Sequence, residues 1–243
     1  MYKMNMKKLF IVAMFFLVAC SGKETAVSNQ VELNFVMQVG TEGLQLNSSK
    51  YTNANGDIYT IEKFAFYISN VVLRNKAKNI TYTEPNSYHL IRIENNNKVS
   101  VSIPAVVANS YDELQFSIGV DSKANASIDK IGDLDPANGM AWDWNTGYKF
   151  LSLEGRYFPT NATAKGLLMH IGENENYKTI TLSLSKPIEV AAGKTSTITI
   201  QTDIAQLFKS PNLINFANTN QVMSGEEAKK IAENYTTMFR VGN

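Results

Sequence analysis

The chain has 243 residues, and its 23 lysines and arginines nearly balance its 22 aspartates and glutamates, giving a formal net charge of +1. A charge this balanced leaves no broad basic surface for a polyanion, so nucleic-acid binding is not expected. Cys20 is the only cysteine, which excludes an intramolecular disulfide.

The first twenty residues, MYKMNMKKLFIVAMFFLVAC, have the layout of a secretory signal. Three lysines lie ahead of an apolar run that ends at Ala19 and is short for a membrane span. The run closes on Leu-Val-Ala-Cys20, which resembles the lipobox of bacterial lipoproteins, where the cysteine is diacylated and becomes the new N-terminus. A buried helix or an uncleaved anchor is the alternative interpretation of the same run.

Residues 21–30 are small and polar and lack a periodic apolar pattern, which is typical of a flexible tether. Two acyl chains make membrane attachment stable without a spanning helix. We therefore expect a cell-envelope protein that is held to the lipid bilayer through Cys20. Ser21 after the cysteine resembles lipoproteins that are sent to an outer membrane. Acylation also removes the thiol as a metal ligand for the folded domain, residues 31–243.

Alternating apolar residues predict that strands dominate this domain. In VELNFVMQV, Val31 to Val39, every second side chain is apolar, and the pleat of a strand sends these side chains to one face. Turn-forming clusters separate most of the further strand candidates, which are Ile61–Leu73, Tyr88–Ile93, Val99–Ile103, Leu114–Val120, Tyr148–Leu153, Gly166–Ile171, Thr179–Leu184 and Thr195–Thr202. This spacing predicts an all-β fold, an antiparallel β-sandwich of about two hundred residues with one core.

Helical spacing is confined to the C-terminal part of the chain. Ser224 and Glu227 have the spacing of a capping box. They precede a stripe of apolar side chains that an amphipathic helix would turn toward the sandwich, namely Ala228, Ile231, Ala232, Tyr235, Met238 and Phe239. Asp203 is expected to cap a shorter helical turn over Ile204 to Phe208.

The segment Gly132–Gly155, GDLDPANGMAWDWNTGYKFLSLEG, resembles the signature of the MbnP-like family, the methanobactin-associated partner proteins. It contains an acidic-proline turn, Gly-Met, Trp-x-Trp and a Gly-Tyr that opens a strand. Pieces that resemble the family in the same order are FAFYISNVVLRN, YHLI, IGVDSKAN, His-Ile-Gly at residues 170 to 172, and MSGEEAKKIAENYTTMF. The resemblance therefore covers nearly all of the mature chain.

The resemblance implies a β-rich, membrane-anchored protein that binds or handles copper. In related copper proteins histidine nitrogens hold the metal, and a tryptophan can be oxidised to kynurenine by a partner dihaem enzyme of peroxidase-like type. Better-known members often end in a histidine-rich tail, whereas this chain ends Arg-Val-Gly-Asn243. Metal binding that depends on such a tail is therefore not expected here.

His89 and His170 are the only histidines, and imidazole and thioether are the ligands that remain for a soft metal such as Cu(I). Parity places His89 with Ile91 and His170 with Leu168, so both rings could face an apolar interior. One interpretation is a shared copper site. The other is that each is a buried histidine with an ordinary hydrogen bond.

Trp142 and Trp144 project from one face if their segment is extended, with Met140 on the same side. These tryptophans are candidates for lining the site and for conversion to kynurenine, and Met140 is a candidate metal ligand. The alternatives are structural: adjacent aromatics commonly fill a core, and methionine is more often core filler than ligand.

A group of aspartates is a candidate calcium site. Four aspartates, Asp121, Asp129, Asp133 and Asp135, could hold Ca²⁺, but they lack the order of a calcium loop and suit turns equally well.

None of the common hydrolase, metalloprotease, phosphate-loop or haem-attachment motifs occurs. We therefore expect a copper-handling lipoprotein that is not an enzyme, with a non-catalytic, metal-free module that binds a partner as the alternative.

Overall fold

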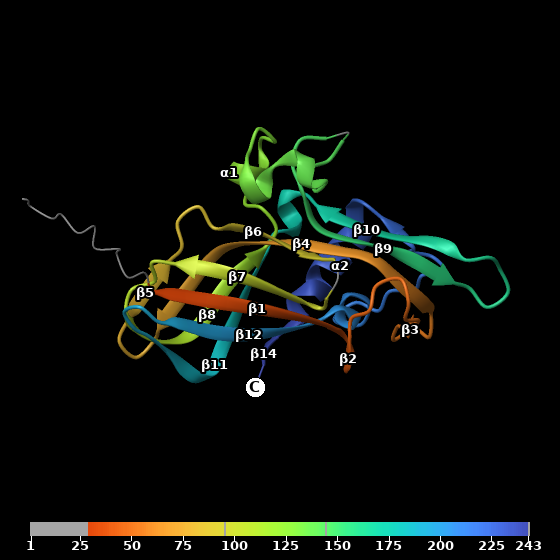
Figure 1. The fold of residues 1–243 in the computed structure, drawn as a ribbon. Helices are drawn as coiled ribbons and strands as arrows, with labels where there is room; N and C mark the ends of the chain where they lie inside the picture. The colour runs from red at the N-terminus through yellow and green to blue at the C-terminus, as the bar shows by residue number, and fades with distance from the viewer. Residues whose placement is uncertain (1–28, 95, 144, 243) are drawn as a thin grey trace, which may run out of the picture.

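A computed structural model describes residues 29–94, 96–143 and 145–242. Within these residues the fold is a sandwich of two β-sheets (Figure 1). The signal segment, Cys20 and most of the tether lie outside them, as does Trp144. The all-β class expected from the alternation is confirmed, and each of the nine segments predicted as strands overlaps a strand.

The smaller sheet has five strands among the described residues: β1 (Gln30–Val39), β2 (Glu42–Gly43), β7 (Lys98–Pro104), β12 (Thr195–Asp203) and β14 (Phe239–Val241). The larger sheet has nine in the same part of the chain: β3 (Tyr51–Thr52), β4 (Ile58–Asn75), β5 (Ile80–Thr83), β6 (Tyr88–Ile93), β8 (Asn109–Ile118), β9 (Lys149–Phe158), β10 (Lys165–Gly172), β11 (Lys178–Val190) and β13 (Gln221–Val222). Most pairings are antiparallel as predicted, but β1 pairs with β12, and β10 with β13, in parallel.

Helices are few and short in the described chain. The α-helices are α1 (Ser122–Asn125) and α2 (Gly225–Asn234), and the 3₁₀ helices are η1 (Gly132–Leu134), η2 (Pro136–Asn138), η3 (Asn174–Asn176), η4 (Ile204–Phe208) and η5 (Tyr235–Thr237). Asp203 caps η4 by accepting a hydrogen bond from the backbone N–H of Ala205, as predicted.

The core lies between the two sheets and follows the predicted alternation. Val31, Leu33, Phe35 and Met37 of β1 are fully buried, and Phe35 makes edge-on contacts with Phe66 of β4 and Phe116 of β8. Edge-to-face aromatic pairs add to the burial of apolar area. The two sheets are thus joined by one continuous core.

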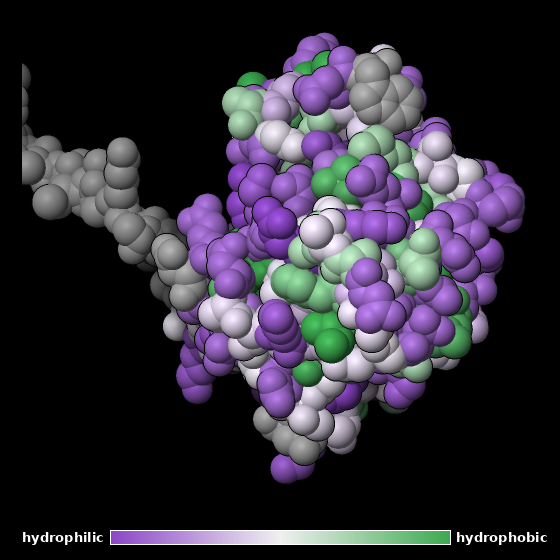
Figure 2. Space-filling view, turned by 90° about the vertical axis from the view of Figure 1, so that its right-hand side faces the viewer, coloured by the Kyte–Doolittle hydropathy of each residue, from purple (hydrophilic) through white to green (hydrophobic). Residues whose placement is uncertain are grey.

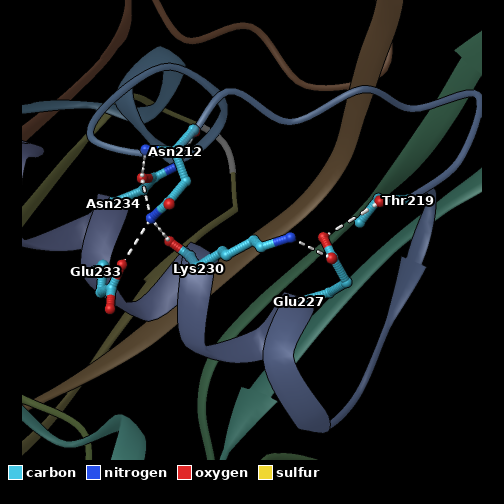
Figure 3. Close-up of polar contacts among 6 residues, drawn as sticks. All are labelled: Asn212, Thr219, Glu227, Lys230, Glu233 and Asn234. Atoms are coloured by element: carbon cyan, nitrogen blue, oxygen red, sulfur yellow. Dashed lines mark hydrogen bonds and ion pairs between the residues drawn. The ribbon is translucent and has the colours of Figure 1, made fainter.

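The C-terminal helix differs from its prediction at both ends. Ser224 is the N-cap residue, but its side chain makes no capping hydrogen bond, and Glu227 instead accepts from Thr219 and pairs with Lys230 (Figure 3). The helix ends at Asn234, and the chain continues through η5 into β14, which contains Phe239. The predicted apolar stripe is nevertheless buried along its whole length.

Asn234, the last residue of α2, connects the helix to η4 and to the segment that follows η4. Its fully buried side chain donates to the carbonyl of Leu207. It also donates to the carbonyl of Asn212 and accepts from the backbone N–H of Asn212 (Figure 3). These hydrogen bonds satisfy the buried amide and fix the end of α2 against this segment. The end of the molecule that lies to the right in Figure 1 has a mostly hydrophilic surface, with a small hydrophobic group near its centre (Figure 2).

A second, smaller core forms on the outer face of the nine-stranded sheet. The segment between β8 and β9, which contains α1, η1 and η2, lies over this face (Figure 1). It contributes Leu134, Met140 and Tyr148, which pack against Ala65 and Tyr67 of β4. The segment that carries the family-like signature is therefore a cover over β4, β6 and β9.

Candidate functional site

The two histidines lie on opposite faces of the nine-stranded sheet. His89 of β6 is paired with Ile68 of β4, and it shares a face with Ile91, which belongs to the core between the sheets. His170 of β10 is paired with Ser152, whereas its neighbours Met169 and Ile171 point into that core. The expectation of one copper ion held by both imidazoles is therefore wrong, because a sheet separates them.

His89 has the surroundings of a structural histidine. Its Nε2 lies 2.8 Å from a carboxylate oxygen of Glu84, and the Glu84 side chain is almost completely buried. Buried polar groups are normally satisfied by such a hydrogen bond. The ordinary-hydrogen-bond interpretation describes this residue well.

His170 belongs to a polar chain on the outer face. Its Nε2 lies 3.0 Å from Oε1 of Glu154, and Oε2 of Glu154 lies 2.8 Å from Nζ of Lys63. Burial acts to raise the pKa of Glu154, but the hydrogen bonds from Lys63 and His170 lower it more. The carboxylate is therefore charged and holds one edge of the imidazole.

The imidazole of His170 is neutral near neutral pH. Burial, with the nearby charge of Lys149, lowers its pKa against the opposing effect of Glu154. A neutral ring that donates from Nε2 keeps Nδ1 as an acceptor or ligand nitrogen, and no described residue makes a hydrogen bond with Nδ1. A carboxylate behind the distal nitrogen is the usual support of a metal-binding histidine.

Trp142 lies beside this histidine. The ring centroids of Trp142 and His170 are 6.3 Å apart, and Nζ of Lys149 lies 5.8 Å from the centroid of the indole. Only 7% of Trp142 is exposed. The indole also lies close to the backbone of Gly172, where an added Cβ would be 2.8 Å from Nε1. Trp144, its predicted companion, is outside the described residues.

Local turns hold Trp142 in place. A β-bridge joins Ala141 to Tyr148, and the backbone N–H of Trp142 donates to the carbonyl of Gly147 at 3.0 Å. Gly147 has a φ of 113°, and the side chain of Asn125 leaves no room there for a Cβ. This is a conformation that glycine adopts readily. Gly147, one of the turn residues predicted around the tryptophans, is therefore required by the backbone conformation of this turn.

Met140 adjoins the same group of residues from the other side. It is 3% exposed and packs in the smaller core with Leu134 and Tyr148. It also lines a cavity of about 390 Å³ together with Glu154 and Ser152. Met140 therefore packs as a core residue, and Glu154 lies between its cavity and His170.

Three of the four aspartates considered for Ca²⁺ accept hydrogen bonds from backbone N–H groups, whereas Asp129 accepts from the hydroxyl of Ser127 and pairs with Lys130. Asp121 accepts from backbone N–H groups of α1, Asp133 accepts from the backbone N–H of Leu90, and Asp135 caps η2. Across the described part of the chain, no three side chains of His, Cys, Asp or Glu are grouped so as to hold a metal ion. These carboxylates thus have the turn role that was the alternative.

Glu154, Lys63 and Gly172 are the members of the site that the sequence pattern did not reveal. Glu154 meets His170 only because β9 and β10 pair in the register that sets Ser152 opposite His170. No spacing rule within one strand links these positions.

Comparison with known proteins gives two matches. A family model described as MbnP matches residues 28–224. The solved structure "MbnP from Methylosinus trichosporium" is similar with a TM-score of 0.52 and 16% sequence identity, over 82% of each chain. No curated protein matches the chain significantly.

Proposed function

This chain belongs to the MbnP family, and on that premise we propose that it is a copper-handling protein whose binding face is the outer side of the nine-stranded sheet. The observation that carries the proposal is the His170–Glu154–Lys63 chain beside Trp142. It presents a neutral imidazole whose Nδ1 is available as a ligand, with the carboxylate support that metal-binding histidines use.

The donor types fit copper in part. Imidazole and thioether are ligands soft enough for Cu(I), and His170 and Met140 supply one of each near Glu154. When bound, copper would supply redox chemistry next to the indole of Trp142. His170 would bind the ion, Glu154 would fix the imidazole, and the cover segment would exclude bulk water. His89 is not part of this proposal because of its place on the other face.

Three related proposals accompany this one. We propose that the chain is exported and lipid-anchored at Cys20, that it is not itself an enzyme, and that a dihaem peroxidase-like partner oxidises Trp142 or Trp144 to kynurenine. Trp142 supports the last proposal because it lies beside the candidate ligand. No helix among the described residues is long and apolar enough to cross a bilayer.

The second candidate function is a metal-free module that binds a partner protein. It is favoured by the burial of Met140 in the smaller core and by the lack of a three-ligand group in the described chain. In that case Glu154 and His170 would serve only to join β9 to β10.

Competition for Cu(I) separates the two functions. The purified chain would be titrated with Cu(I) against a chelator, beside His170→Ala, His89→Ala and Glu154→Gln. We expect one ion in the wild type and in the His89 variant. We expect affinity lower by about 10–100-fold for Glu154→Gln, and lower still for His170→Ala.

The His89 variant is a matched control, because both histidines bond to a carboxylate but on different faces. Equal, weak uptake by all four proteins would reject the copper site and leave the partner-binding module.

Peptide mass spectrometry of protein from its native host would test the oxidation of tryptophan separately. Finding both tryptophans unmodified there would reject the kynurenine proposal.

A further inference from the structure

A cavity of about 390 Å³ opens on the outer face of the nine-stranded sheet beside the candidate copper site. Its floor is formed by β4 and β9, one wall by the end of β6, and its cover by residues 138–140 of the segment between β8 and β9. The copper proposal uses Met140 and Glu154 of the cavity lining and assigns no role to most of the other lining residues.

The floor is hollow because two small residues meet there. The register sets Arg92 of β6, Ala65 of β4 and Ser152 of β9 in one row across three strands, with His170 of β10 next in line. Neighbouring strands lie about 4.8 Å apart, so the short side chains of Ala65 and Ser152 leave a depression between two long ones. The depth of the cavity is therefore fixed by sequence and register together.

Ser152 contributes a hydroxyl that no described residue satisfies. The residue is only 9% exposed and lines the cavity, yet its side chain makes no hydrogen bond with the described part of the protein. Its Oγ is not fully buried, so the hydroxyl is accessible from the cavity. A ligand group that enters the cavity can therefore form a hydrogen bond with it.

Arg92 contributes a guanidinium that is fixed at the mouth. One of its terminal nitrogens donates to the backbone carbonyl of Asn138, which joins the wall to the cover. No described carboxylate forms an ion pair with it, although Glu94 lies on the same strand face. A guanidinium held by one N–H keeps others for a planar, two-oxygen acceptor, and carboxylate is such an acceptor.

The charges around the cavity cancel, and they disfavour a ligand with more than one negative charge. Lys63 and Glu154 neutralise each other at 2.8 Å, which leaves the positive charge of Arg92 and the negative charge of Glu94. A second negative charge on a ligand would face Glu94. The lining also includes the polar residues Asn138 and Ser152, the Ala65 methyl and the Met140 thioether.

We infer that this cavity binds a small monocarboxylic acid with an apolar body, its carboxylate on Arg92 and Ser152 and its body against Ala65 and Met140. The inference does not rest on the copper proposal, since none of these contacts involves a metal ion.

Benzoate is a suitable probe, and benzamide is its neutral counterpart of the same shape. Binding to the purified chain would be measured by calorimetry or ligand-observed NMR in the wild type, Arg92→Gln, Ser152→Ala and Arg156→Gln. Arg156 is the matched control, because it lies on β9 two residues from Glu154, pairs with Glu62 and does not line the cavity.

We expect saturable binding of benzoate and none of benzamide. Loss of a hydrogen bond to a charged group weakens binding by about tenfold or more, so Arg92→Gln and Ser152→Ala should both bind more weakly while Arg156→Gln equals the wild type. Equal binding by Arg92→Gln and wild type, or no benzoate binding at all, would overturn the inference. Both outcomes are independent of Cu(I) uptake.

Discussion

Gly172 is the residue whose identity depends most directly on the candidate site. A Cβ at this position would lie 2.6 Å from the carbonyl oxygen of Tyr148 and within 2.9 Å of two indole atoms of Trp142. The carbonyl of Gly172 is itself fixed by a hydrogen bond from the buried side chain of Asn176. The indole can therefore rest against β10 beside His170 only because position 172 carries no side chain.

Gly172→Ala should displace the Trp142 indole. Forcing a methyl group into a tightly packed site costs about 1–3 kcal/mol, so we expect a loss of stability of that order. The indole N–H signal of Trp142 should also shift in NMR spectra recorded in a Trp144→Phe background.

Gly166→Ala is the matched control on the same strand, because a Cβ there meets only Gln221, at 3.9 Å. If the Gly172 and Gly166 variants show the same Trp142 signal and the same stability, the close contact between Gly172 and the Trp142 indole is not as the structure describes.

At the scale of elements, β4 organises the larger sheet. It pairs with β9 through its first half and with β8 through its second half, while β3, β5 and β6 also pair with it. Glu113 of β8 links β8 to the end of β4 by ion pairs with Arg74 and Lys76, and its side chain is almost completely buried. The hydrogen bond from Lys76, followed by that from Arg74, lowers the pKa of Glu113 against the effect of burial.

Acid should weaken this connection. Because the folded pKa of Glu113 lies below its ordinary value of 4.5, its stabilisation is present above that value and is lost as pH falls through the folded pKa. Glu113→Gln should reduce the free energy of unfolding by about 1–3 kcal/mol at pH 7 and flatten its decline below pH 5. Denaturant unfolding at several pH values measures both effects.

Glu189→Gln on the adjacent strand β11 serves as the comparison, because Glu189 is exposed. If the free energy of unfolding of Glu113→Gln declines with falling pH in parallel with that of the wild type, protonation of Glu113 does not cause the loss of stability in acid.

At the scale of the whole molecule, the described residues form one sandwich, with the proposed binding face on its outer side. The first strand, β1, begins at Gln30, so the tether proposed for residues 21–30 leads directly into the smaller sheet. The proposed site therefore lies on a different sheet from β1, the strand that follows the proposed tether.

Attachment to the membrane should depend on Cys20 alone. In a bacterial host the wild-type chain is expected in the detergent phase after phase separation, because two acyl chains give stable anchoring. Cys20→Ser should move to the aqueous phase or remain as unprocessed precursor, whereas Ser21→Ala should still partition with detergent. A mature Cys20→Ser protein in the detergent phase would contradict lipidation at this residue.

The sequence by itself determined the fold class and most of the elements. A strand shows its buried face as a period of two, so Val31, Leu33 and Phe35 could be assigned to a core before any pairing was known. The stripe ending in Met238 and Phe239 was likewise predicted to be buried, although Phe239 proved to lie in β14. Resemblance in the Trp-x-Trp segment indicated the family.

Only the tertiary structure decided the site. In LLMHIG both alternating sets contain leucine, so parity could not tell which face of the strand meets the core, and it was the pairing with Ser152 that placed His170 outside and apart from His89. The contact between His170 and Glu154 has the same origin. Register between strands is a property of the folded sheet, because it brings together residues that no local spacing connects.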